Sequence, residues 1–453
     1  MQTYQEFQTA VSENRLTAYI GEAIRKHINS DEYKLAVTAN EYDAQRNITI
    51  NQASRYFYNL AGKKVVDFTA SNNRIASNFF HRLNNQRCAY SLGNGITFDE
   101  EGIKERLGDK FDTDVFILAS YALRHGVSFG FWNVDRLYAF PLTEFVPLWD
   151  EADGSLRAGI RFWCLDPKKK PTYAVLYEED GYTKYESASN IGLTMRVTEE
   201  KRAYRQTVQH TEAGGDEIIG EYNYSALPIV PLYGNRNRQS TLVGMRAAID
   251  SYDLIQSGFA NDLVDCAQIY WIIGNALGMD DTDVQRFLDR MRVNHVVVAD
   301  TDNSSVTPYT QEVPYSGREA YLNRIQSSIY RDFGAFNPET VSAGAITATQ
   351  INAAYQPMDE EADAFEYEII EFIQQILALN GLEGTPQFKR NRISNQSEQI
   401  TNVMQEAELL DDETILSLLP NITPDMIPVI LARKDAQDAS RWTEEATELP
   451  TEA

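Results

Sequence analysis

Residues 240–266, STLVGMRAAIDSYDLIQSGFANDLVDC, open the stretch that decides the fold, and that stretch runs on to residue 375. Apolar residues recur in this segment at spacings of three, four or seven: Leu242, Met245, Ile249, Tyr252, Phe259 and Leu263. Such spacing places these side chains on one face of a helix. Ser240 is a residue type that commonly caps a helix N-terminus. The sequence therefore predicts a long amphipathic helix here.

Two further helices and the chain between them complete this stretch. Residues 316–333 carry a similar apolar stripe and predict a second helix, whereas 268–310 have β-prone ends around a helical middle. Residues 337–346, NPETVSAGAI, show no periodicity and predict a loop of small residues. A third helix is expected over 347–380. Pro357 should kink it, because proline removes one backbone hydrogen bond and clashes with the preceding turn.

The rest of the chain predicts helices at both ends and strands between them. Residues 1–60 are polar with helical periodicity, and 71–92 predict a helix because Ile75, Phe79, Leu83 and Ala89 lie near helical spacing. From residue 126 to 232 the pattern changes to that of strands, with Asp-Gly turns. Residues 388–393 predict one more strand. The overall expectation is an α+β fold that ends in helices and an acidic, disordered tail over 435–453.

Composition bounds the class of protein. The chain has 453 residues, enough for two or three domains, and a formal net charge of −25. An acidic chain is a poor candidate for holding nucleic acid or an anionic membrane, although DNA could pass through such a protein without sticking. The cysteines Cys88, Cys164 and Cys266 are few and far apart, which implies no disulfide framework. No secretory signal and no run of about 18 apolar residues is visible.

Motifs that carry chemistry are missing from the sequence. It contains no phosphate-cradling P-loop and no Gly-x-Ser-x-Gly elbow, and its five histidines are isolated. Asp150 and Asp153 are better explained by a turn than by a calcium site, because the other loop ligands are absent. The acidic run 411–413 is better explained by helix capping than by catalysis. The sequence therefore predicts no enzyme, no metal site and no cofactor.

An ordered series of segments resembles the portal proteins of tailed bacteriophages, of the siphophage type. The series covers roughly residues 47–433. It consists of Asn72–Ile75 and Tyr90–Gly93, which resemble the N-terminal wing; Ala226–Val230, which resembles the strand leading into the stem; Ile249–Asp253 with Ser257 and Asn261, which resemble the first stem helix; and Ser342–Ala345 before a long helix, which resembles the tunnel loop. In this family the helix after the tunnel loop is kinked, as Pro357 also predicts.

The resemblance implies a division of the chain into the regions of a portal fold. These are an N-terminal mixed α/β wing over 1–239, a first stem helix over 240–266, a small α/β clip over 267–311, a second stem helix over 312–336, a tunnel loop over 337–347, a long kinked helix and return of the wing over 348–396, and a short helical crown with an acidic tail over 397–453. Compared with the family, the crown is short and the tunnel loop lacks Lys and Arg.

The resemblance also implies particular site residues. The DNA-facing loop residues would be Thr340, Val341, Ser342, Ala343, Gly344, Ala345, Ile346 and Thr347. Contact with the terminase or an adaptor would fall on Trp271, Asp300, Asp302 and Asn303 in the clip. Small side chains can approach a duplex closely, and the absence of aromatic, Arg and Lys residues argues against base recognition.

The function and partners implied are those of a ring-shaped DNA channel, a dodecamer at one vertex of the capsid. It would serve genome packaging, DNA retention, ejection and head–tail connection. The expected partners are double-stranded DNA, the terminase large subunit, the major capsid and scaffolding proteins and a head–tail adaptor. The expected location is the virion, with assembly in the host cytoplasm. The alternative is a head-to-tail adaptor or another virion structural protein without a packaging role.

Overall fold

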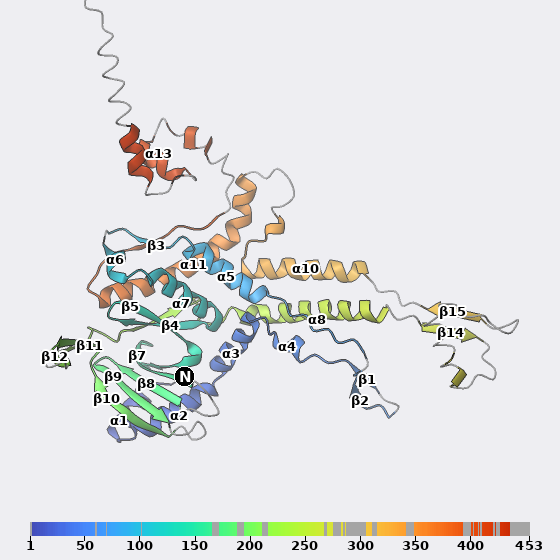
Figure 1. Ribbon diagram of the computed structural model, residues 1–453, viewed down its shortest axis with the longest axis horizontal. Helices are drawn as coiled ribbons and strands as arrows, with labels where there is room; N and C mark the ends of the chain where they lie inside the picture. Colours follow the sequence, from blue (N-terminus) through green and yellow to red (C-terminus); the bar gives the residue numbers. More distant parts are fainter. Residues whose placement is uncertain are drawn as a thin grey trace, which may run out of the picture.

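The computed structural model contains a body of helices and sheets from which a pair of long helices projects (Figure 1). It describes residues 2–58, 61–68, 70–100, 102–164, 172–187, 194–210, 216–266, 270–274, 282–283, 286, 305–309, 315–340, 348–392, 400–401, 403–405, 407, 410–419, 422 and 426–434.

The larger sheet of the body is antiparallel, with its five strands in the order β10-β9-β8-β7-β6. The strands are β6 (Phe145–Trp149), β7 (Leu156–Cys164), β8 (Thr172–Glu178), β9 (Gly181–Ser187) and β10 (Met195–Arg202). Helices α1 (Tyr4–Ser12) and α2 (Leu16–Ile28) cover one face of this sheet. Apolar residues such as Phe7, Ile20 and Ile24 share a core there with Val146 and Leu176. The hairpins expected at the two Asp-Gly turns are confirmed.

A smaller sheet forms the centre of the body, and its order is β13-β4-β5. Its strands are β4 (Val127–Asn133), β5 (Arg136–Pro141) and β13 (Ile229–Tyr233), and the short helix η1 (Leu142–Glu144) follows β5. Helices α7 (Phe111–His125) and α11 (Ala348–Leu379) pack against these strands through Leu118, Phe129, Phe372 and other buried residues. Phe372 of α11 therefore shares a hydrophobic core with α7 and β4, which lie more than 200 residues earlier in the sequence.

The remaining elements of the body connect or edge these layers. They are α3 (Asp31–Asp43), α4 (Ile48–Asn51), α5 (Phe79–Leu92), α6 (Ile103–Leu107), the ribbon of β11 (Arg205–His210) with β12 (Asp216–Tyr222), and the pair of β3 (Ile96–Phe98) with β16 (Pro386–Phe388). The strand predicted over 388–393 is wrong in most of its extent: β16 covers 386–388, so the two ranges share only Phe388, and residues 389–392 form neither helix nor strand. Helix α13 (Asp412–Leu418) is capped by Asp411, as the acidic run there predicted.

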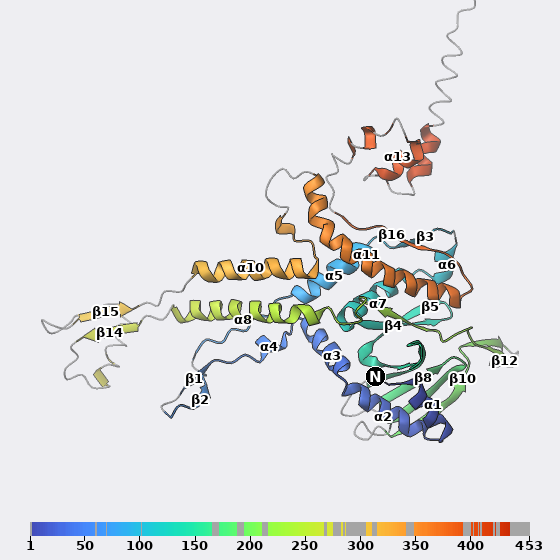
Figure 2. The same cartoon turned by 180° about the vertical axis from the view of Figure 1, so that it is seen from behind.

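The projecting helices are α8 (Leu242–Cys266) and α10 (Tyr315–Phe333), which run antiparallel. Figures 1 and 2 show the strands β14 (Tyr270–Gly274) and β15 (Ser305–Tyr309) at their far end, and a ribbon of β1 (Tyr56–Tyr58) with β2 (Lys64–Val66) that points the same way. The short helix η2 (Pro338–Thr340) follows α10. The mixed α+β fold and the three long helices are confirmed, each within two residues of its predicted start and end.

One predicted helix is wrong in its first half. The chain from 71 to 78 is neither helix nor strand, and α5 begins only at Phe79. Ile75 is 37% exposed, so it does not belong to the buried face that its spacing suggested. The physical reason is a set of hydrogen bonds to α8, described below, which take the backbone N–H groups that a helix would use internally.

Candidate channel-forming elements

The end of the helix pair nearest the body, which we call the root, is packed into the body. Leu242, Met245 and Ile249 of α8 are buried together with Ile329 and Phe333 of α10. Side chains of α3 and α5 complete this core: Ala39, Tyr42, Phe79, Phe80 and Leu83. The Ser240 side chain accepts a hydrogen bond from the Leu242 N–H (3.2 Å), close to the capping role predicted for it. The apolar side chains of the root are therefore buried in a hydrophobic core formed by one chain alone.

The distal half of the pair is held by fewer contacts and leaves apolar surface open. Phe259 of α8 meets Tyr315 of α10 edge to face at 5.6 Å, and Asp262 pairs with Arg318. Beside them lies an open hollow of about 560 Å³, and its lining residues are Leu254, Ile255, Gly258, Gly317, Arg318 and Tyr321. A methyl group at either Gly258 or Gly317 would meet no atom of the described residues within 4 Å, so there is open space beside both glycines.

A third face of α8 binds the non-helical chain 71–77 through a ladder of polar side chains. Asp253 accepts from the Ser77 N–H (2.9 Å), Ser257 from the Ile75 N–H (2.9 Å) and Asn261 from the Asn73 N–H (2.6 Å). The series ends with Asp265, whose carboxylate is hydrogen-bonded to Ser71. We name Asp253, Ser257, Asn261 and Asp265 the α8 ladder.

The α8 ladder works because two chain periods nearly match. Four residues of an α-helix advance roughly 6.0 Å, and two residues of an extended chain advance roughly 6.6 Å. Acceptors at every fourth helix position therefore meet N–H groups at every second position of the neighbouring chain. The helix presents acceptors to this segment much as the edge of a sheet would.

The two acidic ends of the ladder have different electrostatic surroundings. Asp253 is fully buried; burial raises its pKa, although hydrogen bonds from Asn47 and Ser77 partly oppose the shift. Asp265 is paired with Arg55, and hydrogen bonding to Arg55 lowers its pKa. The ladder therefore has a buried end near the root and an ion-paired end near the tip.

The chain on either side of the predicted tunnel loop is clamped to α5 by stacked rings. Phe336, just after α10, stacks on Tyr355 of α11 at 4.3 Å, and Tyr355 stacks on Tyr90 of α5 at 5.8 Å. Gln86 of α5 donates to the Phe336 carbonyl (3.0 Å). Rings in this arrangement contribute more than their buried area alone. Phe336, immediately before the predicted loop, and Tyr355, eight residues after it, are therefore both held against α5.

Arg87 of α5 joins the end of α10 to α11. Its guanidinium is buried, lies over the Phe333 ring at 4.4 Å and donates to the Phe333 carbonyl. It pairs with Glu361 at 3.1 Å. Burial lowers the pKa of Arg87, and Glu361 opposes that shift. A charged group at this depth needs such partners, so Arg87 couples three helices at one point.

Much of the acidic face of α11 is neutralised by two arginines. Arg390 donates to Glu366 (2.8 Å) and to Asp359 (3.2 Å), and it also pairs with Asp363. Hydrogen bonding to Glu366 is the main reason that its pKa is raised. Arg392 pairs with the same Asp359. These three carboxylates bind the returning chain to the helix.

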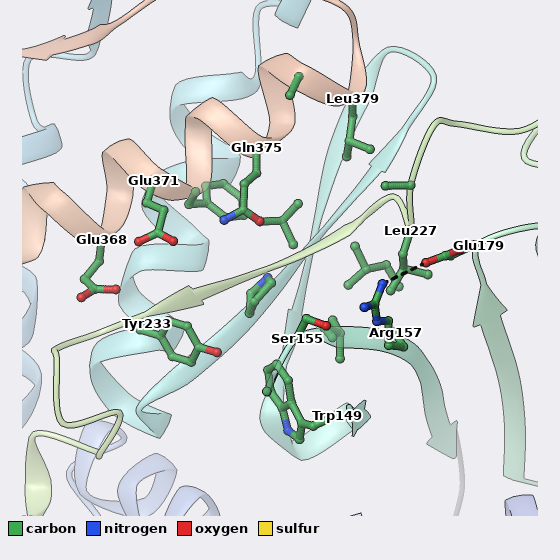
Figure 3. A pocket seen from close by; sticks show the side chains of 18 of the residues that line it. Trp149, Ser155, Arg157, Glu179, Leu227, Tyr233, Glu368, Glu371, Gln375 and Leu379 are labelled. Carbon is green, nitrogen blue, oxygen red and sulfur yellow. Dashed lines mark ion pairs between the residues drawn. The ribbon is translucent and has the colours of Figure 1, made fainter. Parts of the chain in front are cut away.

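A cavity of about 470 Å³ lies between α11, β13 and the β6–β7 turn (Figure 3). Glu368 and Glu371 project toward it from α11, while Trp149, Arg157 and Glu179 line the opposite side. Burial and the neighbouring Glu371 raise the pKa of Glu368. Arg157 pairs with Glu179 at 3.8 Å and also with Asp150 and Asp153 of the turn. Within the described ranges, no three His, Cys, Asp or Glu side chains are placed to hold a metal ion.

The structure places some of the predicted site residues and leaves others outside the described ranges. Thr340 ends η2, and Trp271 lies in β14 with Pro308 of β15 as its register partner. The loop residues from 341 to 347, together with Asp300, Asp302 and Asn303, lie outside the described residues. Their assignments stay predictions.

Pro357 lies inside α11, which is assigned as one helix across it. Figures 1 and 2 show that α11 bends along its length. The kink assigned to Pro357 itself stays a prediction.

Sequence reasoning missed Arg87 as the junction of three helices. A signal for the ladder was present, because polar residues recur every fourth position from 253 to 265. No signal in the sequence tells which chain such a face will bind, since the partner segment lies almost 200 residues earlier.

Comparison with known proteins shows the family of this chain. A family model described as phage portal protein, SPP1 Gp6-like, matches residues 37–449. The chain belongs to this portal protein family. Within the part of this portal-family chain that the structure describes, no helix has the length and apolarity needed to cross a membrane.

Two curated relatives are portal proteins. That of Bacillus phage SPP1 is 25% identical over 386 residues, which cover 79% of this chain and 74% of the relative. That of Clostridium phage phiCD119 is 22% identical over 401 residues, which cover 81% of this chain and 86% of the relative.

Two structural likenesses are weaker. A chain from the neck of a native GTA particle gives a TM-score of 0.43 at 11% identity, covering 76% of this chain and 90% of its own. A chain from the virion of a native gene transfer agent gives a TM-score of 0.40 at 11% identity, and the match covers 84% of this chain and 99% of that chain.

Proposed function

We propose that this portal-family chain forms a closed ring, a dodecamer, through which double-stranded DNA enters and leaves the capsid at one vertex. In this proposal α8 and α10 are the stem, the chain from 267 to 311 is the clip, and residues 337–347 are the tunnel loop. The body is the wing, and the chain after residue 397 forms the crown. The ring belongs to the virion and assembles in the host cytoplasm.

The observation that carries this proposal is the exposed apolar surface on opposite sides of α8. Leu254 is 44% exposed and Leu263 is 42% exposed. At about 100° per residue, nine residues turn through roughly 900°, so these two side chains point in opposite directions. A surface with two different apolar sides associates head to tail, and such an interface closes into a ring when the rotation allows it.

The proposed partners follow from the regions. The terminase large subunit docks at the clip during packaging and supplies the ATPase that this sequence lacks, and a head–tail adaptor uses the same end afterwards. The body faces the major capsid and scaffolding proteins. The chain itself acts as a structural channel, with no catalytic site and no cofactor.

The basis for proposing that DNA slides through the ring is the formal net charge of −25. A duplex carries one phosphate per roughly 1.7 Å, so a basic lining would retain it and an acidic one lets it slide. The tunnel loop touches the duplex through small side chains and reads no bases.

Electron microscopy and native mass spectrometry of the full chain test the ring. We expect a closed ring with a central hole wide enough for a duplex. Leu254→Glu should reduce the ring to smaller species, because it places a charge in the interface, while Tyr138→Glu on the exposed side of β5 should not. A wild-type chain that stays monomeric or dimeric at micromolar concentration contradicts the proposal.

Two variants test the channel assignments within an intact ring. Deletion of Ser342–Ala345 should leave the ring assembled and reduce packaging or retention of DNA; wild-type levels of both would make the loop a surface connector. Pro357→Ala should straighten α11 and shift the loop, which a reconstruction of the variant ring can measure. An unchanged helix axis would contradict the role given to Pro357.

A further inference from the structure

The ribbon of β1 and β2, together with Phe68, exposes a run of aromatic side chains. We name the described residues of this stretch, 56–58 and 61–68, the arm. Tyr56 is 49% exposed, Phe57 47%, Tyr58 73% and Phe68 91%. Single exposed aromatics are ordinary, but four within thirteen residues form a patch that usually marks an interaction site. None of these four rings belongs to a hydrophobic core cluster among the described residues.

The base of the arm is held firmly. Before the arm, Arg55 pairs with Asp262 and Asp265 of α8 and donates to the Ser71 carbonyl (3.2 Å). After the arm, the chain from Ser71 onward is bound by the α8 ladder. Both ends of the arm are therefore fixed to the same part of α8, and its direction is set by the helix.

The arm itself is a poor candidate for an independently stable unit. Its two strands pair over three residues each, and isolated two-stranded ribbons are marginal in water. Aromatic residues on such a ribbon become favourable when another surface covers them. A fixed base and an uncovered aromatic ribbon together indicate an element that is completed by docking.

We propose that the arm of one copy packs against the distal half of the helix pair of the next copy. This inference rests on the proposed ring and names the element that ties neighbouring stems together. Asp262, where the arm is rooted, lies one helical turn beyond Gly258 of the hollow, so arm and hollow form one continuous side of the molecule. That side meets the opposite side of the neighbour.

The receiving surface is the side of α8 and α10 that carries Leu263 and Tyr315. Leu263 is 42% exposed and lies one turn beyond Phe259, which contacts Tyr315, itself 54% exposed. Figures 1 and 2 show the arm running in the direction of the distal half of α8. In the proposed ring, neighbouring copies are related by rotation about an axis parallel to the helix pair. Such a rotation does not shift a copy along the axis, so the arm reaches its neighbour at the height of Leu263 and Tyr315.

Photo-crosslinking of the assembled full chain tests this docking. p-Benzoylphenylalanine in place of Phe68 should join two copies after irradiation, and peptide mapping should place the bond in residues 259–266 or 315–321. The matched control carries the same group in place of Tyr222, an exposed aromatic (60%) on the β11–β12 ribbon, which lies away from the helix pair. It should give no bond to those peptides.

Each other outcome of this experiment has a defined meaning. Bonds confined to the same copy overturn the proposal, since the arm would then cover its own chain. Bonds to the body of a neighbour, or to a different protein, overturn it as well. A ring that forms normally without any arm crosslink defeats this inference and leaves the proposed function standing. Absence of a ring in the wild-type chain defeats both.

A second measurement does not depend on crosslinking. The double variant Tyr58→Ser, Phe68→Ser should lower the fraction of intact ring about tenfold at limiting concentration, a typical effect for removing interface aromatics. Its monomer should fold normally because both side chains are largely exposed. Tyr222→Ser serves as the control and should leave ring assembly unchanged. Equal ring stability in the arm variant and the control overturns the proposal.

Discussion

The two halves of the α8–α10 helix pair contrast in how their apolar residues are used. In the root, Ile249 and Ile329 are fully buried within a core shared with α3 and α5. In the distal half, Leu254, Leu263 and Tyr321 are between 42% and 45% exposed. Periodicity alone does not separate the two halves, because both carry an apolar stripe.

This difference shows which apolar surface a single chain buries by itself and which it leaves exposed. Burial of the root stripe is complete in a single copy, so it contributes to the stability of the monomer. The distal stripe is only partly covered by its partner helix, so the remaining surface can contribute to stability only in an assembly. Mutations in the two halves should therefore affect different measurements.

The largest expected effect is on the root. Ile249→Ala should lower the free energy of unfolding by about 2–5 kcal/mol, because it removes buried methylenes and leaves a cavity. The matched distal variant Leu254→Ala should change the unfolding of the monomer by about 0.5 kcal/mol or less, as exposed sites usually do. Urea unfolding of both variants under conditions that keep the chain monomeric measures the contrast. Equal losses of stability would show that the two halves are not distinct.

The sequence predicted much of the helical framework. Apolar spacing located α8, α10 and α11, since long amphipathic stripes are a strong signal. It failed for residues 71–78, where Ile75 and Phe79 have helical spacing but the backbone N–H groups bind α8 instead. That choice depends on side chains almost 200 residues away, which a local pattern cannot register.

The candidate site could be predicted only in part. Ser257 and Asn261 belong to a segment that resembles the first stem helix of portal proteins. The structure shows that both side chains bind the extended chain around Ile75 and Asn73. The tunnel and clip assignments depend on the resemblance, because periodicity locates a loop without telling what it faces. Arg87 could not be found, since its partners Phe333 and Glu361 come from two other helices, each more than 200 residues later in the sequence.

A smaller effect is expected at the buried end of the α8 ladder. Asp253→Ala should destabilise the monomer by about 1–3 kcal/mol, because the Ser77 N–H and the Asn47 amide lose their acceptor in a buried place. Asp253→Asn is the matched control, since the carbonyl oxygen of asparagine can still accept one hydrogen bond. The loss of stability in this variant should be smaller than in Asp253→Ala. Thermal or urea unfolding measures both. A result in which Asn costs as much as Ala would argue that charge, not hydrogen bonding, matters at this position.

In the middle of the ladder the expected effect is about 1 kcal/mol. Ser257→Ala removes one acceptor for the Ile75 N–H and little volume. Hydrogen exchange at the Ile75 amide should become faster in this variant, whereas amides in α7 should be unaffected. Unchanged exchange at Ile75 would mean that the extended segment is held by its other contacts.

The smallest expected effect distinguishes the two ends of the ladder by pH. Asp253 has a pKa above the ordinary value of 3.8, so the folded state binds its proton more tightly than the unfolded chain does. Its contribution to stability is present at low pH and is lost as the pH rises through the raised pKa. Asp265 has a pKa below 3.8, so its contribution is present above that value and is lost as the pH falls through the lowered pKa.

Carboxyl carbon resonances followed by NMR from pH 2 to 7 should therefore titrate in the order Asp265 first and Asp253 last. Arg55→Gln should move the Asp265 midpoint upward, toward its ordinary value, because it removes the cation that favours the carboxylate. The same change should leave Asp253 unmoved, because Arg55 is not among the groups that shift its pKa. If both carboxylates titrate together, the buried root and the ion-paired tip of the ladder share one environment, and the contrast between the two halves does not extend to their electrostatics.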